Sequence, residues 1–305
     1  MVIKEKRRIE EIESYFKKYP DVPKEVIIKE DLLRLGFGFT PAALKAAEGS
    51  RLKSYYIFAW DQVDEKKAGV QEDIRQRVPE DIKLSGGMYK LKRTVVCTRV
   101  NTDSPYLIDV VDGKLSLTEN GTVIADVRLD PEPPYYSKTF EDGTPYMQLA
   151  PTVFGAFSVF VNPFRHCQYW DTGEECLYCD IGFNVRLRQK MGKKTGKVSD
   201  VVSDPKQVAE AVAAAFAEKW DNPELGPKVI QMSGGSITHG LHGMDELTFY
   251  LQYVTAIREK VGYRPPLCLV IEAGDKKTMQ RIKEAGASSF TADFEVWDKR
   301  IFEWL

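Results

Sequence analysis

Hydrophobic positions in the first half of the chain indicate short helices followed by antiparallel strands. Apolar residues recur at helical spacing over residues 5–19, again from about residue 29 to Gly36, and after Pro41, which stands where a helix begins. From about residue 88 to 150 the segments are short, rich in β-branched residues and separated by Asp-Gly and Asn-Gly pairs. Such segments are typical of β-hairpins. We therefore expect residues 1–150 to form a smaller α+β domain.

Strands and helices alternate after residue 150. The continuous apolar run at residues 153–161 predicts a buried parallel strand, and Asp204 followed by Pro205 predicts the start of a strong helix. Later strands are expected at 228–232, 267–274 and 288–296, and later helices at 245–262 and 276–286. Repeated β-α units indicate a parallel sheet with crossover helices, in either a barrel or a doubly wound fold.

The chain ends a few residues after the fourth of these strands. Four β-α units are too few to close a barrel, so either the sheet is open or the sequence is a piece of a longer protein. We favour the second interpretation because the apolar residues Ile301, Phe302, Trp304 and Leu305 have nothing after them that could bury them. Residues 151–305 are therefore expected to form an incomplete domain of parallel strands and crossover helices, either barrel-like or doubly wound.

Composition and charge exclude several classes of protein. The 305 residues are 43% hydrophobic and 29% charged, with a formal net charge of −2, which is typical of a soluble globular protein. We expect no general attraction to nucleic acid or to an anionic membrane. No apolar run is long enough to span a bilayer, and the charged N-terminus lacks the apolar core of a signal peptide. The expected compartment is the reducing cytoplasm.

Three of the five cysteines lie close together in the sequence. Cys167, Cys176 and Cys179 have the spacing C-x8-C-x2-C and directly follow the strand predicted at 153–161. In a cytosolic protein such a group indicates a metal site more often than disulfides. Three thiolates can hold three irons of a [4Fe–4S] cluster and leave the fourth iron open for another ligand. The position after a strand is also where parallel β/α folds carry their chemistry.

A zinc site is the alternative for these cysteines. His166 or a distant residue could complete a tetrahedral set with the three thiolates. A structural zinc site usually pairs two C-x2-C knuckles, whereas this chain has one. The corresponding function is that of a non-catalytic, zinc-stabilised α/β protein that binds a partner. A third possibility is a nucleotide-binding regulator that uses only the Gly234–Gly235 pair.

The cysteine loop resembles that of the radical SAM superfamily. In that family three cysteines follow the first barrel strand, usually as C-x3-C-x2-C, with an aromatic residue before the third; Tyr178 has that place here. The wider first spacing is a departure, and its extra residues must bulge away from the cluster. The resemblance implies a [4Fe–4S] cluster on Cys167, Cys176 and Cys179, and reductive cleavage of S-adenosylmethionine to a 5′-deoxyadenosyl radical. It also implies an oxygen-sensitive enzyme with an electron donor such as flavodoxin or ferredoxin. The fold that it implies for residues 151–305 is a partial (β/α) barrel of the radical SAM type, with about four β-α units.

The same resemblance assigns further contacts to S-adenosylmethionine. The family has a Gly-Gly-Glu-like turn after the second strand, where this chain has Gly234, Gly235 and Ser236. The serine replaces the usual acid, which leaves the role of the glycines in place. Glu272 and Glu295 stand near the ends of the third and fourth predicted strands, where family members contact the ribose or the amino group. Each could instead cap a loop or pair with a basic residue.

Other features of the sequence are less specific. Six basic residues between 186 and 197 are expected to form a solvated loop, or else to bind an anionic group of the cofactor or substrate. Cys97 and Cys268 are expected to be small core residues. The segment 142–151 and the last residues of the chain are similar to radical SAM proteins encoded beside nitrilases. The substrate, a small molecule or another kind, is not specified by that likeness.

Overall fold

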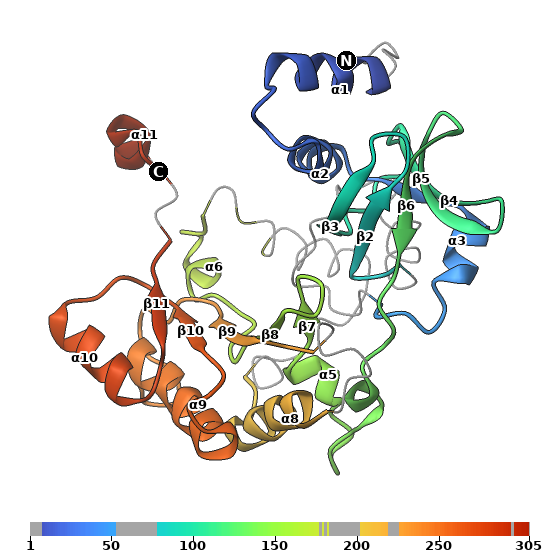
Figure 1. Ribbon diagram of the computed structural model, residues 1–305. Helices are drawn as coiled ribbons and strands as arrows, with labels where there is room; N and C mark the ends of the chain where they lie inside the picture. The colour runs from blue at the N-terminus through green and yellow to red at the C-terminus, as the bar shows by residue number, and fades with distance from the viewer. Residues whose placement is uncertain are drawn as a thin grey trace. The chain divides into compact units, whose positions relative to one another are not determined.

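The computed structural model describes residues 8–52, 78–176, 179, 182, 202–218, 226–293 and 296–304. The chain divides into two compact units, Met1–Glu132 and Pro133–Leu305 (Figure 1). Each unit has its own β-sheet and its own hydrophobic core, so the protein is of mixed α/β class. Within the described ranges no helix is long and apolar enough to cross a membrane.

The first unit is built on a six-stranded sheet. In spatial order its strands are β1 (Gly38–Phe39), β4 (Tyr106–Val111), β5 (Lys114–Glu119), β6 (Thr122–Arg128), β2 (Asp81–Gly86) and β3 (Leu91–Cys97). β1 runs parallel to β4, and every other neighbouring pair is antiparallel. Both residues of the Asp112–Gly113 and Asn120–Gly121 turns have φ between 48° and 79°. This is the left-handed conformation that tight hairpin turns need, and it confirms the predicted hairpins.

Helices of the first unit are α1 (Arg8–Lys18), α2 (Lys24–Leu35) and α3 (Pro41–Ala46). α2 begins at Lys24, before the start near residue 29 that we expected, because Pro23 at its N-cap ends the preceding turn. Ile28 and Leu32 on α2 are buried in one core with apolar residues of the sheet, including Ile82 and Val96. α3 begins as predicted, and the Thr40 side chain accepts a hydrogen bond from the Ala43 N–H at 3.1 Å.

The second unit is built on a five-stranded sheet. In spatial order its strands are β11 (Ser289–Thr291), β10 (Leu267–Val270), β9 (Val229–Ser233), β8 (Ser158–Val161) and β7 (Thr152–Val153). β8, β9, β10 and β11 are parallel neighbours in chain order, and β7 is antiparallel to β8. The repeated β-α pattern in the sequence therefore correctly predicted that these strands are parallel.

The apolar run at residues 153–161 is not one strand, contrary to our expectation. Phe154, Gly155 and Ala156 all have positive φ, between 55° and 70°, and turn the chain so that β7 folds back on β8. β10 and β11 are also shorter than predicted. The last paired residues are Val270 of β10 and Thr291 of β11, and Val270 also pairs with Ser233, the last residue of β9.

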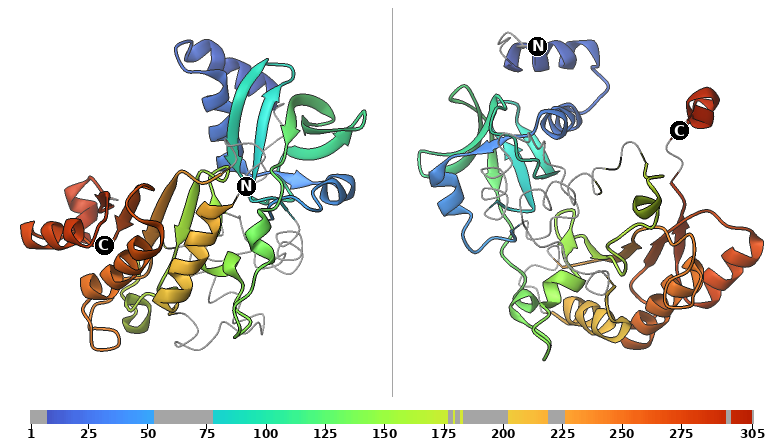
Figure 2. Two further views of the ribbon diagram at one scale, coloured as in Figure 1. Left: turned by 60° about the horizontal axis from the view of Figure 1, so that its bottom comes forward. Right: turned by 180° about the vertical axis from the view of Figure 1, so that it is seen from behind.

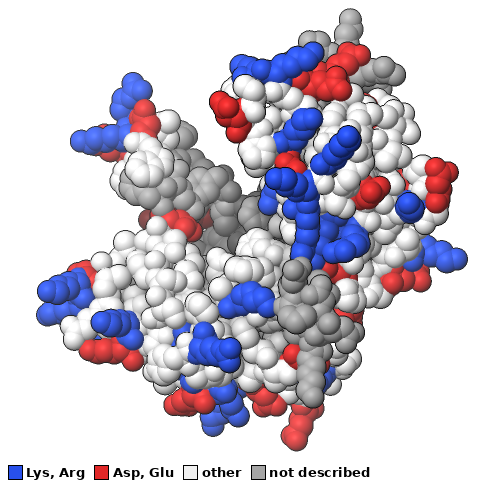
Figure 3. Space-filling view, in the orientation of Figure 1, with Lys and Arg blue, Asp and Glu red and all other residues white. Residues whose placement is uncertain are grey.

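Three helices cover one face of this sheet (Figures 1 and 2). They are α8 (Pro205–Ala217), α9 (Glu246–Val261) and α10 (Lys276–Glu284), and shorter pieces are η1 (Pro134–Ser137), α5 (Tyr146–Leu149), α6 (Tyr169–Thr172) and α11 (Lys299–Trp304). The side chains of Asp204, Asp245 and Asp275 accept backbone N–H groups at the starts of the three long helices. Lys and Arg side chains are interspersed with Asp and Glu over this unit's visible surface (Figure 3), as expected for solvated helix faces.

Residues 133–150 pack within the second unit. Tyr135, Tyr146 and Leu149 are buried in the core that contains β8, β9, α8 and α9. The Tyr135 hydroxyl donates a hydrogen bond to the carbonyl of Ala150 inside that core. The expected boundary at 150 therefore differs from the division after Glu132, because these aromatic side chains belong to the later core.

Candidate functional site

The predicted cysteine loop and the predicted glycine turn lie against each other. The cysteine loop follows β8, and the turn follows β9, so both leave the carboxyl ends of neighbouring parallel strands. The Gly235 N–H donates to the Phe164 carbonyl at 3.0 Å, and the Gln168 N–H donates to the Ser236 carbonyl at 3.1 Å. These bonds join two segments that are about 70 residues apart in sequence, as the numbering shows.

The paired glycines are needed for this contact. A Cβ on Gly235 would lie 1.5 Å from the carbonyl oxygen of His166. A Cβ on Gly234 would lie 2.3 Å from the Tyr250 hydroxyl oxygen and 2.9 Å from the Phe164 carbonyl oxygen. We expected the glycines to allow close approach to a ligand. In the structure they allow close approach of the chain to its own cysteine loop.

Gln168 is a second link between the two segments, and no motif in the sequence points to it. Its side chain is buried, with 6% of its surface exposed. Its Oε1 accepts the backbone N–H groups of Thr238 at 2.7 Å and His239 at 3.0 Å. Its Nε2 donates to the Gly240 carbonyl at 3.0 Å. A glutamine beside a cysteine is ordinary in a sequence, so only the fold shows this role.

Cys167 is a partly buried thiol surrounded by hydrogen-bond donors. Burial raises the pKa of this thiol, and the nearby charge of Cys176 raises the pKa further. Hydrogen bonds from the backbone of Ser236 and Tyr169, and from the Ser236 hydroxyl, act in the opposite direction. Ser236, which the resemblance assigned to S-adenosylmethionine, therefore contacts the thiol in this structure.

Cys176 and Cys179 belong to a tight turn. The Cys179 N–H donates to the Cys176 carbonyl at 2.9 Å; Cys176 is exposed and Cys179 is partly buried. In the described ranges, no three His, Cys, Asp or Glu side chains are gathered closely enough to hold one metal ion. The donor set fits a cluster with one open iron in number and chemistry, since it offers three thiols and N–H donors to the first of them.

His166, the alternative zinc ligand, has a partner of its own. Its Nε2 lies 2.9 Å from Oδ1 of Asp171, and its ring packs edge-on against Trp170. A carboxylate that holds one nitrogen of a histidine is common around metal-binding histidines, because it fixes the ring for coordination by the other nitrogen. The other two histidines, His239 and His242, are exposed.

Two carboxylates lie near the loop ends. Glu272 follows β10, and the Tyr169 hydroxyl lies 3.5 Å from its Oε1, at the limit of a hydrogen bond. Glu246 is the first residue of α9 and was not identified from the sequence. Burial and the charge of Glu272 raise the pKa of Glu246 to about 7, against an opposing hydrogen bond from the Ile237 backbone. Tyr178, Glu295 and the basic segment 186–197 lie outside the described residues.

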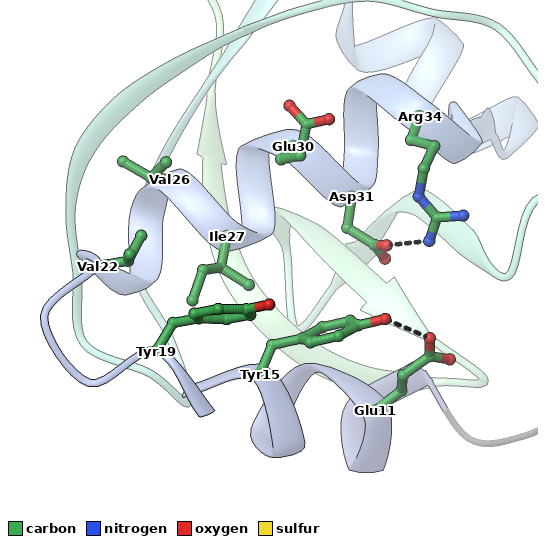
Figure 4. Close-up of a pocket in the computed structure, with 9 residues that line it drawn as sticks. All are labelled: Glu11, Tyr15, Tyr19, Val22, Val26, Ile27, Glu30, Asp31 and Arg34. Carbon is green, nitrogen blue, oxygen red and sulfur yellow. Dashed lines mark hydrogen bonds and ion pairs between the residues drawn. The ribbon is translucent and has the colours of Figure 1, made fainter. Parts of the chain in front are cut away.

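A separate groove of about 390 Å³ lies in the first unit, between α1 and α2. The rings of Tyr15 and Tyr19 lie side by side along it, with Val26 and Ile27 on the facing helix (Figure 4). Its polar edge includes an ion pair between Arg34 and Asp31 at 2.7 Å. None of the predicted site residues lines this groove.

Comparison with known proteins does not assign the site. No protein-family model, curated protein or solved structure matches the chain significantly. The chemistry of the site therefore rests on its own residues and on the sequence motif that they form.

Proposed function

We propose that this chain contains the core of a radical SAM enzyme. A [4Fe–4S] cluster would be held by Cys167, Cys176 and Cys179. The observation that carries the proposal is the hydrogen-bonded contact between the Cys167 loop and the Gly234–Gly235 turn. A proposed metal ligand and a glycine turn meet there at the carboxyl edge of a parallel sheet, which is the functional edge of β/α folds.

The winding of the second unit supports a partial (β/α) barrel. β8, β9, β10 and β11 follow one another in the sheet in chain order, and the helices between them cover one face (Figure 1). A barrel has this progression, whereas a doubly wound sheet reverses its strand order and carries helices on both faces. We infer that β8, β9, β10 and β11 are consecutive strands of such a barrel.

A bound cluster would supply an electron for reductive cleavage of S-adenosylmethionine to methionine and a 5′-deoxyadenosyl radical, which takes a hydrogen atom from the substrate. The residues of the chain bind and orient. The N–H groups of Ser236 and Tyr169 stabilise the Cys167 thiolate. We propose the Gly234–Ser236 backbone and Glu272, together with Tyr178 and Glu295, as contacts of S-adenosylmethionine. An electron donor such as flavodoxin or ferredoxin is required, and the substrate class is open.

The second candidate is a non-catalytic protein stabilised by zinc. The pairing of His166 with Asp171 favours it, because a zinc-binding histidine usually has such a partner. His166 directly precedes Cys167, so it could complete a set of one nitrogen and three sulfur ligands. This protein would be colourless and would hold one zinc ion tightly.

Metal analysis and a cleavage assay decide between the two candidates. Protein purified without oxygen is expected to be brown, with broad absorbance near ~400 nm from thiolate–iron charge transfer. With a strong reductant it should convert S-adenosylmethionine into methionine and 5′-deoxyadenosine. Stoichiometric zinc without iron, in colourless protein that does not cleave S-adenosylmethionine, would overturn the radical SAM proposal and support the zinc protein.

A further inference from the structure

We propose that Gln168 is a positioning residue that holds the segment after the Gly234–Gly235 turn against the cysteine loop. A ligand bound to this turn would then lie beside the metal that Cys167 holds. This inference rests on the proposed function, because it assigns Gln168 a part in placing S-adenosylmethionine next to the cluster. It concerns a residue that is neither a metal ligand nor a member of the glycine turn.

Gln168 forms hydrogen bonds along the whole segment 236–240, which follows the paired glycines. The backbone N–H of Gln168 donates to the Ser236 carbonyl. Its side-chain amide forms hydrogen bonds with backbone groups of Thr238, His239 and Gly240. Both ends of the side-chain amide are used in one orientation, with the oxygen accepting two N–H groups and the nitrogen donating to a carbonyl. The segment is therefore held by Gln168 at four backbone groups.

Burial makes the side-chain amide hard to replace. Gln168 is 6% exposed, so water has little access to the N–H groups of Thr238 and His239 if their acceptor is removed. A buried N–H group without an acceptor destabilises the conformation that buries it. The segment is then expected to move away from the cysteine loop, while the Gly235 N–H still bonds to the Phe164 carbonyl. Gln168 would thus control the position of residues 238–240, which follow the turn.

If Gln168 has this role, loss of its side chain should affect ligand binding but not metal binding. The thiols are supplied by Cys167, Cys176 and Cys179, whereas the hydrogen bonds of the Gln168 side chain go to Thr238, His239 and Gly240. Loss of the side-chain amide should therefore leave metal content largely intact. It should weaken the binding of a ligand that needs both the metal and the glycine turn in fixed positions.

The test compares Gln168→Met with a matched variant, Gln207→Met, in the intact chain. Methionine has nearly the size of glutamine but makes no comparable hydrogen bonds. Gln207 also donates a long-range hydrogen bond in the second unit, from its Nε2 to Oδ2 of Asp142 at 2.8 Å, and Asp142 is not part of the cysteine loop. Three quantities are measured: amide hydrogen exchange of residues 236–241 without ligand, iron per chain, and KM against kcat for S-adenosylmethionine cleavage.

We expect Gln168→Met to speed exchange at Thr238 and His239 at least tenfold and to keep most of its iron. Its KM for S-adenosylmethionine should rise at least tenfold, with a smaller change in kcat. The change that S-adenosylmethionine causes in the electron paramagnetic resonance spectrum of the reduced cluster should weaken in parallel. Gln207→Met should match the wild type in all of these. Gln168→Glu, which keeps the acceptor, should restore slow exchange at Thr238 and His239.

Wild-type exchange and KM in Gln168→Met would overturn the inference. A variant that loses stability and iron but keeps a wild-type KM in its loaded fraction would also overturn it, since that result shows a structural role alone. If Gln168→Met does not fold, Gln168→Asn takes its place, because its shorter side chain withdraws the amide from Thr238, His239 and Gly240 and should produce the same changes in exchange and KM. Failure of the proposed function appears differently, as wild-type protein without iron or without cleavage of S-adenosylmethionine.

Discussion

Gly235 lies directly against the main chain of His166. A Cβ atom at position 235 would lie 1.5 Å from the His166 carbonyl oxygen and 2.7 Å from the Cα of Cys167. The atoms in the way belong to the backbone, so no change of side-chain rotamer can make room. The turn after β9 and the loop that carries the first cysteine therefore behave as one packed structure.

Gly235→Ala should separate this turn from the cysteine loop. The added methyl group forces the backbone apart, and overpacking of this kind costs about 1–3 kcal/mol or more. We expect the free energy of unfolding to fall by about that amount in urea titrations followed by circular dichroism. Iron per chain and cleavage of S-adenosylmethionine should fall as well, because Ser236 can no longer donate to Cys167.

Gly243→Ala is the matched control, since Gly243 lies in the same connection between β9 and α9. Gly243 has φ of +76°, and a Cβ there meets no described atom within 4 Å. Alanine should therefore cost only about 1 kcal/mol, through backbone strain. If Gly235→Ala unfolds and loads iron like Gly243→Ala, the close approach is not needed for the site.

Replacing each clustered cysteine by serine should remove the metal. Cys167→Ser, Cys176→Ser and Cys179→Ser should each lose most of their iron and all reductive cleavage, because a cluster with one open iron needs three thiolates. The measurement is iron and sulfide per chain after anaerobic reconstitution. Cys97→Ser and Cys268→Ser are controls, since Cys97 lies in β3 of the first unit and Cys268 lies within β10, so neither residue belongs to the cysteine loop. Equal loss in the controls would contradict a cluster confined to the loop.

The sequence predicted best the features that depend on neighbouring residues. Asp112–Gly113 and Asn120–Gly121 form their turns because those residues accept positive φ at little cost. Asp204 caps α8 because a carboxylate just before the first turn reaches free backbone N–H groups two and three residues ahead. Such interactions are decided within a few residues, so pattern and residue type suffice.

Features that depend on distant residues were not predicted. The apolar run at 153–161 contains a turn at Phe154–Ala156, and hydrophobicity alone does not distinguish this turn from a continued strand. Gln168 and Glu246 acquire their roles only when the connections after β8, β9 and β10 meet. Arg258 is a charged residue buried in α9, and its acceptors lie in two connections, between α9 and β10 and between α10 and β11. None of these contacts has a signature in the local sequence.

Arg258→Met should destabilise the second unit strongly. The guanidinium donates to the carbonyls of Gly286, Gly262 and Pro265 at 2.7 to 2.9 Å and to the Ser288 hydroxyl at 3.0 Å. Methionine fills similar space but leaves these acceptors without their donor, so we expect a loss of about 2–4 kcal/mol in unfolding free energy. Arg264→Met removes an exposed charge from the same loop region and should change stability by less than about 0.5 kcal/mol. Equal effects of the two substitutions in urea unfolding would contradict the role of Arg258.

Glu246 should make stability depend on pH near neutrality. Burial and the charge of Glu272 raise the pKa of Glu246 from 4.5 to about 7. Between these values the folded protein holds the proton more tightly than the unfolded chain does. The contribution of Glu246 to stability is therefore fully present below about pH 4.5 and is lost as the pH rises through about 7.

Glu246→Gln removes this dependence, because glutamine stays neutral. Relative to the wild type, the variant should have similar stability near pH 5 and should gain about 1–2 kcal/mol near pH 8, a value reduced for the partial exposure of the side chain. Urea unfolding at both pH values measures the difference. Glu259→Gln, at an exposed position on the same helix α9, controls for the loss of a negative charge. A difference between Glu246→Gln and the wild type that is the same at both pH values would show that Glu246 does not titrate between them.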